Sequence, residues 1–235
     1  MSEPTLRAPI LPGTAATDYE RYLRTDELLA LQKPRVAMVH RDELLFQTIH
    51  QTAELWLKLA CFEFEDAAGR VDADDAWAAC RMLRRASSAL DRVIDGTVML
   101  EHLAPADYAV VRHALGHGSG FDSPGFHRTH ELGPVAWAAF ERLLERRGVT
   151  VDVMLDRPHE SPDVFQIAEG LIDWDERLIR WRALHLRLVE RVIGGHVIGT
   201  QGTPVEVLGR RIDVRAFPAL WEARDRLTRA KATLP

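Results

Sequence analysis

The chain has few cysteines, no long apolar run and no excess of basic residues. Only two cysteines, Cys61 and Cys80, occur among 235 residues, too few for a disulfide framework. No apolar run approaches the roughly 20 residues that a membrane-spanning helix needs. The formal net charge is -5, and no basic stripe of the kind used to bind nucleic acid is present. We therefore expect neither a membrane protein nor a nucleic-acid binder.

Three further motifs are missing. The first 20 residues lack the charged stretch followed by an apolar one that marks a secretion signal, so we expect a cytoplasmic protein. No C-x-x-C-H motif is present, so any haem would be held without a covalent bond. There is also no H-E-x-x-H zinc motif. What is present, 46% hydrophobic and 28% charged residues, is typical of an ordinary globular domain.

The composition favours helices, because Leu, Ala, Arg and Glu dominate and runs of β-branched residues are rare. Three prolines within residues 1–15 predict a mobile N-terminal arm, and residues 16–235 are expected to form a single all-α domain. We interpret that domain as a helical bundle with a cofactor site between facing helices. Helices are predicted over residues 17–32, 42–68, 74–102, 105–115, 126–147, 161–194 and 217–231.

Two helix starts carry specific signals. Ser161-Pro162-Asp163 combines a capping residue, a proline at the first helical position and an early acid, and it begins the longest predicted helix. Thr203-Pro204-Val205-Glu206 is a T-x-x-E capping box, although the alternation over 205–214 also fits a short strand. Between the predicted helices, residues 116–125 hold four glycines and predict a loop.

Ten histidines make metal or haem ligation the chemistry to consider. His185 lies within the long helix, and apolar residues at minus seven, minus four, plus three, plus four and plus seven share its face. Such surroundings suit the axial ligand of a haem, and equally a core histidine that donates to a backbone carbonyl. His50 follows Phe46 by four residues on one helix face, which fits either the distal side of a pocket or a plain buried histidine.

Other polar residues carry open alternatives. Two histidine pairs flank the glycine loop and could together bind zinc or iron without haem: His113 with His117, and His127 with His130. Arg128 could grip a substrate carboxylate with two hydrogen bonds, or lie solvated at the surface.

Four segments, in order, resemble the tryptophan 2,3-dioxygenase superfamily. DYERYLRTDELLALQKP is similar to its Y-x-x-Y-L-x-x-x-x-L-L-x-L-Q start, and RDELLFQTIHQTAELWLKL to its H-D-E-x-L-F-x-x-x-H-Q-x-x-E-L-W-x-K segment. SGFDSPGFHR resembles S-G-F-Q-S-x-Q-F/Y-R, and WRALHLRLVERVIG resembles W-R-x-x-H-x-x-x-V-x-R-x-I-G. The resemblance covers most of the chain, and its second and fourth segments are long and specific.

The resemblance implies a haem b cofactor, O2 and an indole amino acid as substrates, and a homo-oligomer, either a dimer or a tetramer. By position, it implies that His185 is the proximal iron ligand and that His50, beside Phe46, is the distal histidine near the indole nitrogen. It further implies that Arg128 and Thr200 bind substrate, that the tyrosines of the first helix reach a neighbouring subunit's pocket, and that three other residues border the haem. The tyrosines are Tyr19 and Tyr22, and the haem neighbours are Phe121, Ser123 and Trp181.

The departures from the family pattern fall on the substrate side. Gly199-Thr200-Gln201-Gly202 is not followed by the S-S-G that ends the family's G-T-G-G-S-S-G loop. Asp122 replaces a glutamine, and Pro124-Gly125 precede Phe126-His127-Arg128. Arg41 occupies the position of a family histidine. The implied function is oxygen insertion into the indole ring of L-tryptophan or a derivative, giving N-formylkynurenine if both atoms enter. The alternatives are a monooxygenase that forms a hydroxylated indole or oxindole, and a haem sensor or carrier without turnover.

Overall fold

The computed structural model describes residues 8–232, which form helices and no strand. An isolated bridge joins Ile198 to Pro204. The all-α prediction is confirmed. The α-helices are α1 (Asp18–Leu23), α2 (Thr25–Leu29), α3 (Glu43–Asp72), α4 (Ala76–Val98), α5 (Pro105–Ala114), α6 (Pro124–Arg147), α7 (Val151–Asp156), α8 (Pro162–Val192), α9 (Glu206–Gly209) and α10 (Pro218–Ala232). Short 3-10 turns lie at η1 (Arg35–Ala37), η2 (Met99–His102), η3 (Gly120–Asp122) and η4 (Pro158–Glu160).

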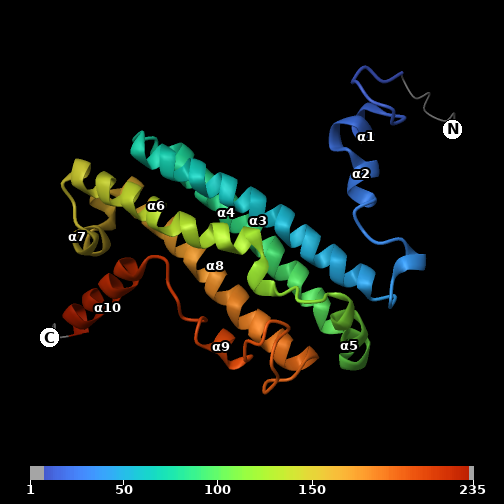
Figure 1. The fold of residues 1–235 in the computed structure, drawn as a ribbon. Coiled ribbons are helices and arrows are strands. Elements are labelled where there is room, and N and C mark those ends of the chain that lie inside the picture. The colour runs from blue at the N-terminus through green and yellow to red at the C-terminus, as the bar shows by residue number, and fades with distance from the viewer. Residues whose placement is uncertain (1–7, 233–235) are drawn as a thin grey trace, which may run out of the picture.

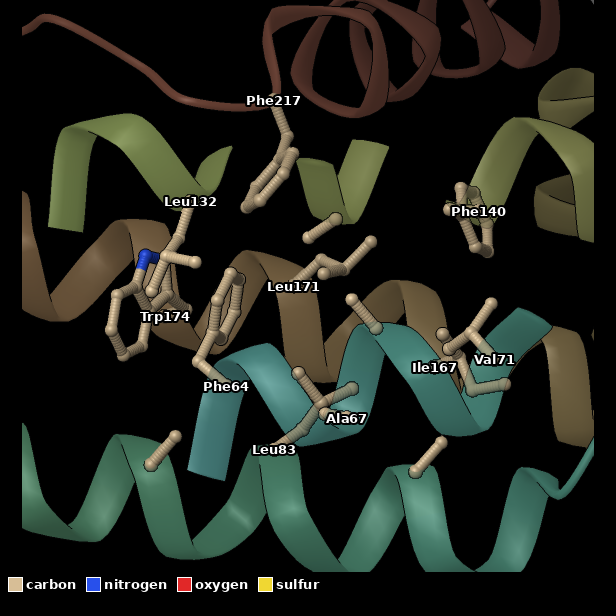
Figure 2. Close-up of a cluster of buried hydrophobic side chains, with 14 of the residues drawn as sticks. Phe64, Ala67, Val71, Leu83, Leu132, Phe140, Ile167, Leu171, Trp174 and Phe217 are labelled. Carbon is tan, nitrogen blue, oxygen red and sulfur yellow. The ribbon is translucent and has the colours of Figure 1, made fainter. Parts of the chain in front are cut away.

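Four long helices, α3, α4, α6 and α8, lie alongside one another and form the bundle (Figure 1). Their apolar faces meet in one core, where Phe64 of α3 stacks on Trp174 of α8 with ring centroids 4.0 Å apart. Leu83 of α4 and Phe140 of α6 belong to the same core, with Phe140 farther along the bundle from the Phe64–Trp174 pair (Figure 2). Burial of these large side chains supplies most of the free energy that stabilises the bundle. No helix among residues 8–232 is long and apolar enough to cross a bilayer.

The C-terminal segment is attached to α8 through one buried carboxylate. Asp175 is fully buried and accepts hydrogen bonds from the backbone N–H of Ala216 at 3.0 Å and from Trp221 Nε1 at 2.9 Å. Phe217, also fully buried, inserts into the core beside Phe64. The stretch between α8 and α10 is therefore held at its α10 end, and it covers one side of the bundle (Figure 1).

Helix boundaries differ from the predicted ones at three places. The first predicted helix, over residues 17–32, is divided into α1 and α2. The break lies at Arg24, which adopts a left-handed backbone with φ of 53° and ends α1. The predicted T-x-x-E capping box does not form. Helix α9 begins at Glu206, and the residue at its N-cap position, Val205, makes no side-chain capping hydrogen bond. Helix α7 was not predicted; Thr150 caps it by accepting from Val153 N–H.

The N-terminal segment stands away from the bundle, with α1 and α2 beyond the end of α3 (Figure 1). Residues 1–7 of the predicted arm lie outside the described residues. Residues after them bind α1, because the Asp18 carboxylate accepts from Ile10 N–H at 2.9 Å and Leu11 N–H at 2.7 Å. The division into arm and domain at residue 15 remains a prediction.

Candidate functional site

A cavity of about 710 Å³ opens between α3, α5, α6, α8 and the loops that follow α5 and α8. Its volume suits a drug-sized ligand or a cofactor. Seven of the predicted site residues line it: Phe46, His50, Phe121, Ser123, Trp181, His185 and Thr200. The structure thus brings together residues that are up to 154 positions apart, between Phe46 and Thr200.

His185 of α8 faces this cavity. Burial, reinforced by the nearby His50, lowers the pKa of His185 from 6.5 to about 4, so its imidazole is neutral at neutral pH. A neutral imidazole offers the lone pair that iron coordination needs. The donor chemistry therefore fits an axial haem ligand.

Gly120 faces the same ring nitrogen. A Cβ at Gly120 would lie 3.9 Å from His185 Nε2, and no other atom is found within 4 Å of that position. A glycine at this position keeps side-chain atoms away from the nitrogen, and in this second respect the site fits haem.

Two aromatic residues fix the orientation of His185. Trp181, one turn earlier on α8, stacks on the imidazole with centroids 4.9 Å apart and planes 12° apart. Phe126 of α6 stacks on the Trp181 ring, with ring centroids 3.7 Å apart. Trp181 Nε1 also donates to Thr97 Oγ1 of α4 at 3.3 Å. Helices α4, α6 and α8 together therefore hold the apolar wall beside the imidazole.

His50 of α3 lies across the cavity with a defined tautomer. Its Nδ1 is 2.7 Å from the Phe46 carbonyl oxygen, which can only accept, so Nδ1 carries the proton and Nε2 is an acceptor. The Phe46 ring lies beside it, 4.0 Å between centroids. His50 lines the cavity, and burial lowers its pKa below the usual 6.5, so the ring stays neutral at neutral pH.

The two loops over the cavity are tied to each other and to α3. Thr200 Oγ1 donates to Gly118 O at 2.7 Å, and Gln201 Nε2 donates to the Asp122 carboxylate at 2.8 Å. Glu54 of α3 accepts from Ser123 Oγ and, at 3.0 Å, from Gly125 N–H. Thr200 therefore does lie over the cavity, despite the altered sequence that follows it.

The structure does not bring Arg128 to the cavity. Its guanidinium pairs with Glu65 at 2.8 Å and Glu131 at 2.9 Å on the outer side of α6. Successive helical residues point about 100° apart, so when His127 and His130 face the cavity, Arg128 turns away. The role predicted for Arg128 in binding a substrate carboxylate stays a prediction, and its guanidinium is engaged outside the cavity in this structure.

Tyr19 and Tyr22 also lie outside this chain's cavity. They are on α1 and are 68% and 78% exposed. The alternative of a non-haem metal site is not supported either, because no cluster of three or more potential metal ligands occurs within residues 8–232. His113 lies on α5 beside a smaller pocket, whereas His127 and His130 line the main cavity.

Four cavity-lining charged residues were missed in the sequence: Glu54, Arg112, Arg182 and Arg211. Glu54 follows His50 by four residues and Arg182 precedes His185 by three, so helical spacing could have found both. Arg211 lies in the irregular stretch after α9, where no periodicity predicts which way a side chain points.

Comparison with known proteins gives a consistent result. The family model for tryptophan 2,3-dioxygenase matches residues 9–134. The tryptophan 2,3-dioxygenase of Caulobacter vibrioides is 35% identical over 260 residues, covering 89% of this chain and 98% of that protein. That of Bacillus thuringiensis subsp. konkukian is 32% identical, covering 89% and 92%. The alignments are longer than this chain, so these relatives contain segments that it lacks.

Proposed function

Because the chain belongs to the tryptophan 2,3-dioxygenase family, and so is a haem-dependent oxidoreductase, we propose that it inserts both atoms of O2 into the indole ring of L-tryptophan. The product would be N-formylkynurenine, formed by opening the ring between C2 and C3 with no external reductant. The observation that carries the proposal is the pairing of His185 and His50, two neutral imidazoles that face one cavity.

The residues that would hold the cofactor come from α8 and the loop before α6. His185 would coordinate the iron, Trp181 and Phe121 would contact the macrocycle, and Ser123 would border it. Haem, when bound, supplies the binding and activation of O2, which no side chain provides. The tied loops at Thr200 and Ser123 would exclude water from the reacting ring.

His50 would orient the substrate. Its unprotonated Nε2 would accept a hydrogen bond from the indole N–H, with Phe46 packed against the ring. Positioning of this kind lowers the barrier because the reacting atoms are held close together before reaction.

We expect His50→Ala to lower kcat/KM for tryptophan about 10- to 100-fold, the effect of one lost hydrogen bond to a well-placed partner. Haem content should not change, because His185 is intact. Steady-state kinetics and haem quantification on the same preparation measure both. His159→Ala, at an exposed histidine remote from the cavity, is the control. Loss of haem from His50→Ala would give His50 an iron-binding role instead.

A second candidate is a monooxygenase of the same superfamily, which would insert one atom of O2, release the other as water and take two electrons from an external reductant. The altered segment Gly199-Thr200-Gln201-Gly202, which covers the cavity, is the observation in its favour, because a changed lid changes how the indole ring is held. A carrier without turnover is a further alternative. Titrating the haem-loaded protein with tryptophan, and then admitting air, distinguishes an oxygenase of either kind from a carrier. A spectral shift followed by tryptophan consumption supports an oxygenase, whereas neither would be seen with a carrier.

The chain would act as a homo-oligomer. Leu55, Leu59 and Phe62 recur along one face of α3 and are 51%, 37% and 61% exposed, and Trp56 beside them is 39% exposed. An exposed apolar stripe of this kind marks an interaction surface. The projecting α1, with Tyr19 and Tyr22, would reach the cavity of a neighbouring copy.

We expect light scattering to give two or four times the chain mass of 26.5 kDa. Phe62→Glu should shift the mass toward that of one chain, because a buried unpaired carboxylate is costly. The control is Trp77→Glu, at an aromatic residue of α4 that is 72% exposed and has the Arg81 guanidinium over its ring. A wild-type protein that stays monomeric at tens of micromolar would contradict this assembly.

A further inference from the structure

Basic side chains gather on one side of the cavity. Arg182 and His130 face it from α8 and α6, and Arg211 faces it from the stretch after α9. They are close enough to affect one another: besides burial, the charges of Arg182 and Arg211 lower the pKa of His130, and Arg211 lowers the pKa of Arg182. Two guanidinium groups thus lie near each other at the edge of an apolar pocket.

No ion pair to Arg182 or Arg211 is found in the described chain, although the charge of buried Asp175 acts on Arg182 and opposes the lowering of its pKa by burial. The acids that line the cavity are Glu54 and Asp122, and each is already engaged elsewhere. Glu54 accepts from Ser123 Oγ and Gly125 N–H, and Asp122 accepts from Ser119 N–H and Gln201 Nε2. Neighbouring like charges repel, and an anion between them would relieve that repulsion.

Arg211 is placed to meet such an anion. Its guanidinium carbon lies 5.3 Å from the centroid of the Phe121 ring, and Phe121 directly follows Gly120, the residue that faces His185 Nε2. None of the hydrogen bonds found in the described chain uses its guanidinium. Arg182 in turn donates to Val214 O at 2.6 Å and so holds the segment that carries Arg211.

The geometry points to Arg211, supported by Arg182, as the carboxylate-binding residue of this site, whereas Arg128 pairs with Glu65 and Glu131 outside the cavity. The inference rests on the proposed function, which puts two kinds of carboxylate in the cavity: the propionates of haem and the carboxylate of the amino acid. A guanidinium suits either, because its paired N–H groups match the two carboxylate oxygens.

The test compares Arg211→Ala and Arg211→Lys with Arg210→Ala, an exposed neighbour that does not line the cavity. The first arm titrates each apoprotein with haem and with haem dimethyl ester, whose carboxylates are blocked. The second arm titrates the haem-loaded proteins with L-tryptophan and with tryptamine, which has no carboxylate. Spectral titration gives Kd in both arms.

We expect Arg211→Ala to weaken binding of one carboxylate ligand about 10- to 100-fold, while its carboxylate-free analogue binds as before. A loss for haem but not its ester assigns Arg211 to a propionate, and a loss for tryptophan but not tryptamine assigns it to the substrate. Arg211→Lys should recover only part of the affinity. Equal effects on acid and analogue, or no effect in either arm, would overturn the inference. A wild-type protein that binds both ligands without turnover would refute the proposed function alone.

Discussion

Replacing His185 with alanine is expected to abolish stoichiometric haem binding. The cavity walls would still attract an apolar macrocycle, but the bond between Nε2 and iron would be gone. Changes to residues that merely support a metal ligand already cost 10- to 100-fold in affinity, so loss of the ligand should cost more than about 100-fold. Haem titration followed by the Soret band measures the effect, and activity should fall in proportion to haem content.

Two controls make this result specific. His159→Ala removes an exposed histidine outside the cavity and should bind haem as the wild type does. Free imidazole should restore a histidine-like spectrum to His185→Ala, because the truncated side chain leaves room for the added ring. A variant that keeps a normal Soret band and axial ligation without imidazole would show that another residue holds the iron.

The second large effect is expected at Asp175, which affects stability. Asp175→Ala leaves the N–H groups of Ala216, Phe217 and the Trp221 indole without their acceptor in a buried site. Unmet buried donors cost about 1–3 kcal/mol each, so the free energy of unfolding should fall by about 3–5 kcal/mol. That is a large share of the stability of a typical domain. Denaturant unfolding monitored by circular dichroism measures it.

Asp173→Ala is the matched control, two residues away on α8. The Asp173 side chain is 54% exposed and pairs only with Arg177 one turn later, so its loss should cost no more than about 0.5 kcal/mol. Asp175→Ala should also bind haem more weakly, because Val214 of the released segment lines the cavity. Equal stability of the two variants would show that Asp175 does not anchor the C-terminal segment.

Sequence patterns predicted the long helices because their apolar residues recur with helical spacing. Helix α8 was predicted at 161–194 and runs from Pro162 to Val192, since Pro162 at the first helical position and the apolar face act locally. Ser161 is the N-cap residue as predicted, but its side chain makes no capping hydrogen bond. The short elements were not predictable in this way. The break at Arg24 depends on one left-handed residue, and the T-x-x-E sequence at Thr203 instead lies in a turn in which Thr203 O accepts from Gly199 N–H.

The candidate site shows the same division between helices and loops. His185, Trp181, His50 and Phe46 lie on long helices, and their spacing and the family resemblance placed them in one cavity. Arg128 lies outside the cavity because a helix turns about 100° per residue, and Arg128 is one residue beyond His127, which lines the cavity. The position of Arg211 depends on Asp175 and Arg182, which hold the C-terminal segment through contacts between residues far apart in the chain.

The most direct measurement is mass spectrometry of the product formed from L-tryptophan by the haem-loaded, reduced protein under isotopically labelled O2. We predict N-formylkynurenine that contains two labelled oxygen atoms. A product with one labelled atom on an intact indole ring would show a monooxygenase instead of the proposed dioxygenase. Unchanged tryptophan, or a product whose oxygen comes only from water, would contradict an oxygenase site between His185 and His50.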